Sequence, residues 1–263
     1  MKNLRHPTAL IHPGAKLADD VAVGAYSIIG EHVEIGAGSV VGPHVVIGGH
    51  TTIGKGNRFF QFSSIGEIPQ DKKYRGEPTR LVIGDNNTIR ESCTLNLGTV
   101  QGGGVTFVGN GNWIMAYVHL AHDCRIGNHN VIANSVQFAG HVTVGNHTLI
   151  GGMSGIHQFV RVGDFAMLGF QTRLSQDLPP FVTAVGNPAE AKGPHQEGPR
   201  RAGYSAPRLD MIKKMYRILY RAGSSFAAAQ QEIAALRGEV ADADADLDNM
   251  LDFLGHASRG IVR

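Results

Sequence analysis

The sequence of 263 residues contains little charge, few aromatic residues and only two cysteines. No run of eighteen apolar residues occurs, so we expect no membrane span. A net charge of +2 gives no global attraction to nucleic acid. Cys93 and Cys124 form neither a CxxC pair nor another metal-binding spacing, and the first residues lack the apolar segment of a signal peptide. We therefore expect a reduced, cytoplasmic protein that binds no nucleic acid.

Glycine, by contrast, is abundant at 35 residues, and apolar residues recur at every sixth position in two long stretches. The first stretch runs from Ile11 to Ile65 and the second from Val108 to Leu174. A period of six fits neither an α-helix nor a flat strand. It is typical of a parallel β-helix with three short strands, and therefore 18 residues, in each turn. The apolar residue and the residue four positions later are expected to face inward. The spacing does not give the hand of the coil.

The repeat predicts a mainly β domain over residues 1–190, with loop insertions at 66–80 and 96–107. Ile65 and Ile83 are 18 apart, so the phase survives the first insertion. That insertion is polar and basic, and we expect it to carry function; the second, which contains GTVQGGG, is expected to be a surface loop. Residues 191–263 are rich in Ala, Leu and charge, and predict a C-terminal helical domain whose first long helix is capped by Ser205.

Histidines are concentrated after three repeat positions that are 18 apart, namely Leu120, Phe138 and Ile156. Stacked turns should place residues 18 apart in one column on an outer edge. One column then contains His122, Gly140 and Gln158, the next contains Asp123, His141 and Phe159, and His119 and His157 lie beside them. We expect Gly140, Gly151, Gly152 and Gly155 to leave room there for a ligand. The remaining coil histidines, His32, His44, His50, His129 and His147, are expected to be solvated surface residues.

Two chemistries suit this histidine cluster. A neutral imidazole could act as general base toward a substrate hydroxyl, with a carboxylate to orient it and a backbone N–H to receive oxyanion charge. Alternatively, three histidines could bind a metal ion whose water becomes the nucleophile, as in a γ-class carbonic anhydrase-like metalloenzyme. A scaffolding β-solenoid without catalysis is disfavoured by the cluster and by the first insertion.

Several motifs together resemble the UDP-N-acetylglucosamine O-acyltransferase family, which catalyses the first step of lipid A synthesis. They are HLAHDC around His122, QDKKYRGEPT in the first insertion, GTVQGGG in the second and the terminal SRGIVR. The similarity covers essentially the whole chain. The sequence is also compatible with another hexapeptide acyltransferase, such as the N-acyltransferase of the same pathway, but that enzyme is expected to carry an additional N-terminal domain.

The resemblance implies a left-handed β-helix that forms a homotrimer with active sites between subunits. It implies transfer of an (R)-3-hydroxyacyl group from acyl carrier protein to the 3-hydroxyl of UDP-N-acetylglucosamine, without a metal or a dissociable cofactor. His122 matches the family's general base, Asp123 its orienting carboxylate and Gly140 its oxyanion donor. The positions that match substrate contacts are Asp71, Lys73, His141, His157, Gln158, Glu197 and Arg201, the last two in the loop after the coil.

Two features bear on the acyl donor. Phe170 occupies a position that is Gly in long-chain members of the family, so the resemblance suggests a blocked acyl groove and a preference for shorter chains. Lys213, Arg217 and Arg221 are four apart and form a basic stripe on the predicted helix. Because acyl carrier protein is acidic, this stripe is a candidate docking surface.

Overall fold

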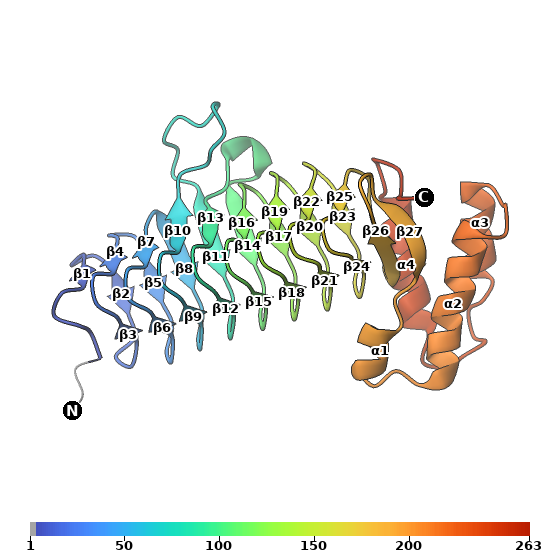
Figure 1. Cartoon of the computed structure of the whole chain (residues 1–263), viewed down its shortest axis with the longest axis horizontal. Coiled ribbons are helices and arrows are strands. Elements are labelled where there is room, and N and C mark those ends of the chain that lie inside the picture. The colour runs from blue at the N-terminus through green and yellow to red at the C-terminus, as the bar shows by residue number, and fades with distance from the viewer. Residues whose placement is uncertain (1–3) are drawn as a thin grey trace.

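The computed structural model describes residues 4–263, and they form a long parallel coil followed by a group of helices (Figure 1). The coil has three sheets that run along its axis. Each chain turn contributes one strand to each sheet, as a parallel β-helix requires. The predicted fold class is therefore observed in its main features.

The strands are two to five residues long. The first sheet contains β1 (Leu10–Ile11), β4 (Ile28–Ile29), β7 (Val46–Ile47), β10 (Ser64–Glu67), β13 (Thr94–Asn96), β16 (His119–Leu120), β19 (Gln137–Phe138), β22 (Gly155–Ile156) and β25 (Arg173–Leu174). The second contains β2 (Lys16–Leu17), β5 (Glu34–Ile35), β8 (His50–Ile53), β11 (Arg80–Ile83), β14 (Val105–Val108), β17 (Arg125–Ile126), β20 (Thr143–Val144) and β23 (Arg161–Val162). The third contains β3 (Ala22–Val23), β6 (Val40–Val41), β9 (Arg58–Phe59), β12 (Thr88–Ile89), β15 (Trp113–Ile114), β18 (Val131–Ile132), β21 (Leu149–Ile150), β24 (Met167–Leu168), β26 (Val182–Val185) and β27 (Glu190–Pro194).

Apart from the two insertions, the register between turns follows the predicted period of 18 as far as β25, and the last parallel pair, Met167 with Thr183, is 16 residues apart. Leu120 pairs with Phe138, and Phe138 pairs with Ile156. All three side chains are buried, as are the inward residues four positions later, for example Val142 and Val160. The core is therefore a continuous apolar column inside the coil.

The six-residue phase survives the first insertion, as predicted, because Ile83 keeps a buried apolar position, although Ile65 and Ile83 do not stack on each other. Ile65 lies in β10 of the first sheet, whereas Ile83 lies in β11 of the second and pairs with Ile53, 30 residues earlier. The first insertion adds twelve residues to a single six-residue step. It projects from the coil between β10 and β11 (Figure 1).

Asparagines line one interior corner of the coil, a feature that the apolar pattern does not predict. Asn57, Asn87, Asn112 and Asn130 are fully or almost fully buried. The Oδ1 of each accepts the backbone N–H of the equivalent residue in the next turn, as from Asn112 to Asn87 at 2.9 Å. The amide groups donate to backbone carbonyls of the corner. The column therefore satisfies its own buried polar groups and fixes the register of successive turns.

The outer corners of the coil often adopt the left-handed backbone conformation three residues after the apolar position. Asp123, His141 and Phe159 have φ of 61°, 62° and 67°. Non-glycine residues rarely adopt this conformation, and Asp, Asn and His tolerate it better than most. The fold itself thus favours Asp or His at the positions from which the candidate site is built.

The helices cover the C-terminal end of the coil (Figure 1). They are α1 (Glu197–Arg201), α2 (Ala206–Tyr220), α3 (Phe226–Ala234) and α4 (Asp244–Gly255). Ser205 caps α2 by accepting the N–H of Arg208, as predicted. The last residues return to the coil, where Val262 is buried and donates its N–H to the carbonyl of Asp177. No helix within residues 4–263 is long and apolar enough to span a membrane.

Candidate active site

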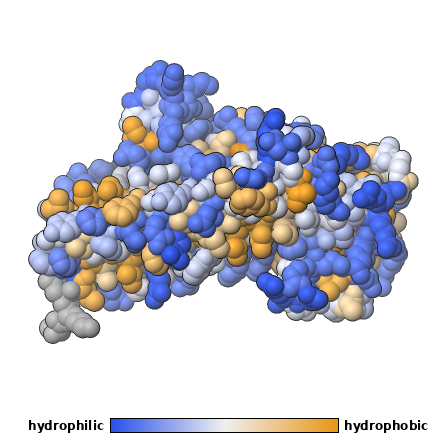
Figure 2. Space-filling view, viewed as in Figure 1, coloured by the Kyte–Doolittle hydropathy of each residue, from blue (hydrophilic) through white to orange (hydrophobic). Residues whose placement is uncertain are grey.

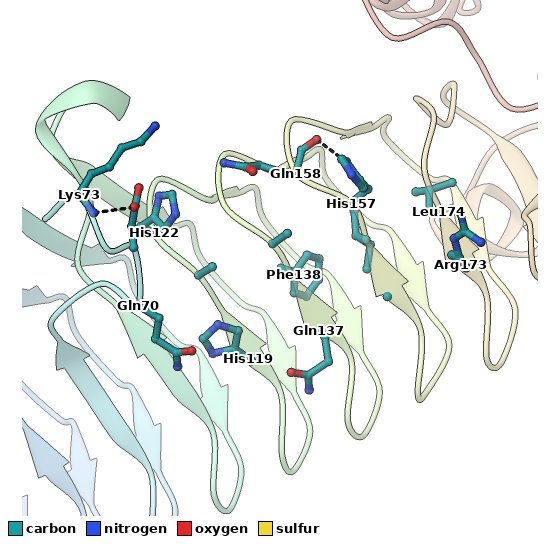
Figure 3. Close-up of a pocket in the computed structure, with 15 residues that line it drawn as sticks. Gln70, Lys73, His119, His122, Gln137, Phe138, His157, Gln158, Arg173 and Leu174 are labelled. Atoms are coloured by element: carbon teal, nitrogen blue, oxygen red, sulfur yellow. Dashed lines mark hydrogen bonds between the residues drawn. The ribbon is translucent and has the colours of Figure 1, made fainter.

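A large cavity lies along the outer face of the first sheet, where that sheet meets the corner that precedes the second (Figure 3). Its volume is about 640 Å³. Its lining consists of Gln70, Asp71, Lys73, His119, Ala121, His122, Gln137, Phe138, Ala139, Gly155, Ile156, His157, Gln158, Arg173 and Leu174. The residues come from the first insertion and from four successive turns of the coil, so the stacking register assembles the cavity.

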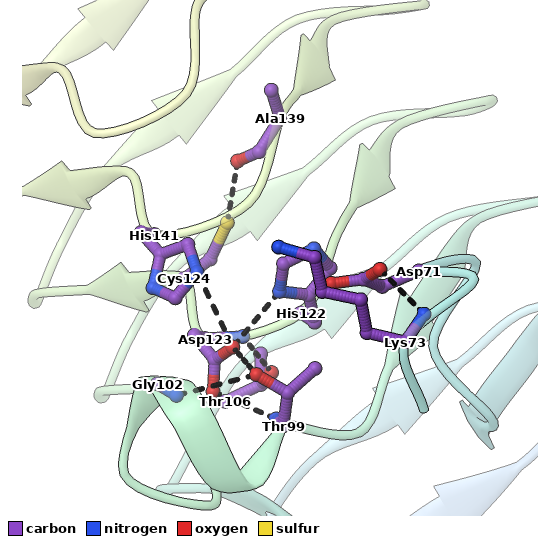
Figure 4. A network of polar contacts seen from close by, with 10 residues as sticks. All are labelled: Asp71, Lys73, Thr99, Gly102, Thr106, His122, Asp123, Cys124, Ala139 and His141. Carbon is purple, nitrogen blue, oxygen red and sulfur yellow. Dashed lines mark hydrogen bonds and ion pairs between the residues drawn. The ribbon is translucent and has the colours of Figure 1, made fainter. Parts of the chain in front are cut away.

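His122 lies in the wall of this cavity and is 8% exposed. Its Nδ1 is 2.8 Å from Oδ2 of Asp123, whose side chain is almost completely buried behind it (Figure 4). Because an ionised carboxylate only accepts hydrogen bonds, this contact assigns the proton of a neutral imidazole to Nδ1. The lone pair of Nε2 is then free to accept a proton.

Gly140 lies one turn away from His122, as the predicted column requires. A Cβ at this position would lie 2.4 Å from Cε1 and 2.6 Å from Nε2 of His122, so only glycine leaves space for the ring. The Gly140 N–H makes no hydrogen bond with any group in residues 4–263. It is therefore available as a donor beside the imidazole.

His141 and His119 flank the dyad. His141 meets the His122 ring edge to face at 5.1 Å and stacks on Phe159, and its Nε2 is 3.7 Å from Asp123 Oδ2. His119 Nδ1 is bonded to the Thr94 hydroxyl at 2.7 Å. Burial is the main cause that lowers the pKa of both His119 and His141, and the nearby His122 lowers both further. These effects favour the neutral form of both rings, although the charges of Asp123 and Asp71 partly oppose the lowering of the His141 pKa.

The second insertion also contributes to the site, so the expectation of a mere surface loop was wrong. Its 3-10 turn, η1 (Val100–Gly102), is capped by Thr99, whose N–H and hydroxyl both donate to the Asp123 carboxylate at 2.8 and 2.6 Å. Thr106 of β14 accepts the N–H of Asp123 at 2.8 Å. The insertion length interrupts the period of six, so the repeat pattern alone does not place Thr99.

The structure brings most of the predicted site residues together. Asp71 and Lys73 reach the cavity from the first insertion, where the Lys73 N–H donates to Asp71 Oδ1 at 2.9 Å (Figure 3). His157 and Gln158 line its far part. The sequence reasoning did not select Gln137 and Arg173. They precede apolar repeat positions and continue the outward column that begins at His119, so the same grid of 18 contains that signal.

Four predicted substrate contacts do not line this cavity in the single chain: His141, which packs against the His122 ring, and Phe170, Glu197 and Arg201. Phe170 is in the turn between β24 and β25, at the other edge of the first sheet. Glu197 and Arg201, which were expected in a loop, belong to α1 and are paired with each other at 2.8 Å. Together with His129, His147 and His195, they line a second cavity of about 330 Å³. His129 and His147 are exposed, as predicted, and they also line this second cavity.

The glycines predicted to leave room for a ligand do so only in part. Gly155 lines the cavity. Gly140 instead accommodates the His122 ring, and Gly151 and Gly152 pack against the turn of Phe170 at the other corner.

One group in the described part of the chain has metal-ligand geometry. The candidate donor atoms of His122, Asp123 and His141 lie within 4.8 Å of one another. However, both Asp123 oxygens already accept hydrogen bonds from Thr99, and Oδ2 also contacts His122. A metal ion would have to displace these contacts, so the site fits a dyad better than a metal centre.

The chain is similar over its whole length to known acyltransferases. Family models described as "Udp N-acetylglucosamine O-acyltransferase; Domain 2" and "Bacterial transferase hexapeptide (six repeats)" match residues 177–262 and 106–140. Proteins named acyl-[acyl-carrier-protein]–UDP-N-acetylglucosamine O-acyltransferase from Thiobacillus denitrificans and Leptothrix cholodnii are each 55% identical to it, and each alignment covers 98% of both chains. The crystal structure of UDP-N-acetylglucosamine O-acyltransferase from Moraxella catarrhalis is 44% identical, with a TM-score of 0.95 over 99% of this chain and 100% of that one. A coil of opposite hand would not superpose in this way, so this β-helix has the hand of its family. It is therefore left-handed, as the resemblance implied.

We predict that Gly140→Ala inactivates the site without unfolding the coil. The added methyl group overlaps the His122 ring, and a displacement of about 1 Å at a catalytic group can cost about 10²-fold in rate. Turnover and the melting temperature should be measured together. Gly48→Ala is the matched control, because a Cβ there meets no atom within 4 Å and the residue does not line the cavity. Equal activity in Gly140→Ala and the native protein would contradict the described position of His122.

Proposed function

Because the chain belongs to the UDP-N-acetylglucosamine O-acyltransferase family and is an acyltransferase, we propose that it transfers an (R)-3-hydroxyacyl group from acyl carrier protein to UDP-N-acetylglucosamine. The acceptor is the sugar 3-hydroxyl, and the reaction is the first step of lipid A biosynthesis. The observation that carries the mechanism is the His122–Asp123 contact at the wall of the main cavity.

In this mechanism, Nε2 of His122 removes the proton of the sugar hydroxyl as its oxygen attacks the thioester carbonyl. The Gly140 N–H donates to the carbonyl oxygen as it becomes negatively charged. The imidazolium that forms is stabilised through its Nδ1–H by the Asp123 carboxylate. Collapse of the tetrahedral intermediate breaks the C–S bond, and the thiolate of the carrier protein receives the proton from Nε2. The proton of the sugar hydroxyl thus passes through Nε2 to the departing thiolate, and no step requires a metal ion or a cofactor.

The remaining polar residues of the cavity suit a sugar nucleotide. Lys73 and Arg173 supply positive charge for phosphate groups, and Asp71, His157 and Gln158 supply groups that bond to hydroxyls and amides. Burial lowers the pKa of His119, which favours its neutral ring, and a neutral imidazole can accept as well as donate such bonds.

We propose that the protein assembles as a homotrimer with the active site between subunits. Apolar side chains remain exposed along one corner of the coil, namely Tyr26, Phe62, Tyr117, Met153 and Phe170. On the adjoining face of the first sheet, Leu10, Ile28 and Val46 are also exposed. The coil shows several such apolar patches, whereas the projecting first insertion is hydrophilic (Figure 2). Extended apolar surfaces of this kind are typical of interfaces. A neighbouring subunit would also supply Phe170, Glu197 and Arg201, which lie outside the main cavity of their own chain. Sedimentation at the mass of a single chain would contradict this assembly.

The acyl carrier protein is proposed to dock on the basic face of α2. Lys213 is bonded to Asp210 at 2.8 Å, which reduces its contribution. Arg217 and Arg221 line a groove together with Lys192 and Tyr216. Charge steering of this kind weakens as salt is added.

The proposed location is the cytoplasm. Cys93 and Cys124 are buried thiols that form no disulfide, and burial raises their pKa to about 11 and about 12. Reduced thiols agree with this location.

The direct test of the proposed function is acyl transfer to UDP-N-acetylglucosamine from a set of 3-hydroxyacyl carrier proteins. We expect product from the native protein, and a loss of about 10²- to 10⁴-fold in kcat in His122→Ala, the size of a general-base contribution. His32→Ala is the control, because that exposed ring stacks only on His50 and lies outside both cavities. No product with any chain length, or full activity in His122→Ala, would contradict the proposal.

Phe170 is proposed to set the preferred acyl length. Phe170 is 65% exposed, and its ring lies over Gly152 of the preceding turn of the coil. Phe170 itself lies just before β25, and Arg173 and Leu174 of that strand line the cavity. Replacement by Gly should lengthen the groove and move the maximum of kcat/KM to longer 3-hydroxyacyl chains. Each methylene in an apolar pocket changes kcat/KM by about 10- to 200-fold. An unchanged chain preference in Phe170→Gly would show that the ring does not limit the groove.

A further inference from the structure

The Asp123 carboxylate is held by a segment outside the repeat pattern. The Thr99 N–H donates to Oδ1, and the Thr99 hydroxyl donates to Oδ2 (Figure 4). Thr99 is 1% exposed and does not line the cavity, so it does not contact the substrate. Its two hydrogen bonds fix the plane of the carboxylate.

The fixed carboxylate lies between two imidazoles. Oδ2 is 2.8 Å from Nδ1 of His122 and 3.7 Å from Nε2 of His141. A pivot of about 1 Å toward His141 would therefore exchange one partner for the other. Nothing in the two histidines themselves decides between these arrangements, because both can donate to a carboxylate.

The glycines of the second insertion allow this close approach. A Cβ at Gly102 would lie 2.0 Å from the Asp123 carboxyl carbon, and a Cβ at Gly98 would lie 2.9 Å from Oδ1. Neither glycine has a positive φ, so the backbone conformation itself does not require glycine. Because Gly98 and Gly102 have no side chains, the 3-10 turn can lie in contact with the Asp123 carboxylate.

We propose that Thr99 is a positioning residue that commits the Asp123 carboxylate to His122 rather than to His141. The hydroxyl bond to Oδ2 and the contact with Gly102 prevent the pivot. As a result, His122 keeps its proton on Nδ1 and presents Nε2 to the sugar hydroxyl. This inference rests on the proposed general-base function of His122.

The test compares Thr99→Val, which loses the hydroxyl but keeps the backbone N–H, with Thr99→Ser, which keeps both. In Thr99→Val we expect kcat to fall about tenfold, with little change in the KM for UDP-N-acetylglucosamine. His122 then loses part of the carboxylate partner that stabilises its imidazolium, so the acid limb of the pH profile of kcat/KM moves to lower pH. Thr99→Ser should restore both kcat and the limb. Ser39→Ala, which removes a buried hydroxyl bonded only to Gly54 and Asn57 in the N-terminal turns of the coil, is the control and should move neither.

Two further measurements keep the test decisive. If Thr99→Val does not fold, Gly102→Ala is a second way to displace the Asp123 carboxylate, because the added Cβ would overlap it. This variant should shift the acid limb of the pH profile in the same direction. Proton NMR should show the His122 Nδ1–H signal shifted downfield in the native protein and in Thr99→Ser, and weakened in Thr99→Val. An unmoved acid limb in a folded Thr99→Val or Gly102→Ala would overturn the role of Thr99. Full activity in His122→Ala would instead contradict the proposed function itself, so the two failures are distinguishable.

Discussion

The parallel pairing of successive turns is the interaction on which the rest of this structure depends. Each short strand is bonded to strands of the turns before and after it, so one register is repeated along the whole coil. Burial of the apolar column and the bonds of the interior asparagines maintain that register. Once it is fixed, residues 18 apart become neighbours. The contact between His122 and Gly140 follows directly from this stacking.

The corner conformation adds a second constraint. Asp123 and His141 occupy the same left-handed position of adjacent turns, which a polar residue of this kind tolerates. Their backbones direct both side chains to one corner, beside His122. A carboxylate that is almost fully buried there needs hydrogen-bond donors around it. Thr99 and His122 provide these donors, so the scaffold and the proposed chemistry share the same hydrogen bonds.

Much of the fold and part of the site could be predicted from the sequence, because the period of six converts directly into positions in space. The columns of His122 with Gly140 and of Asp123 with His141 are examples. Prediction was wrong at the second insertion, which breaks the period: a surface loop was expected there, and the contact of Thr99 with Asp123 was not foreseen. Glu197 and Arg201 also lie apart from His122 in one chain, because the tail obeys no repeat. Their proposed role depends on a neighbouring subunit, which no spacing within one sequence describes.

The central claim is that a histidine–carboxylate dyad, and not a metal ion, performs the proposed acyl transfer. The most direct test is the activity of the protein after exhaustive dialysis against a chelator, with its metal content measured on the same sample. The account predicts undiminished transfer from the 3-hydroxyacyl carrier protein at substoichiometric metal, and no stimulation by added zinc or iron. Loss of activity on chelation and its recovery with one equivalent of metal per chain would contradict the dyad and favour metal-assisted chemistry at His122, Asp123 and His141.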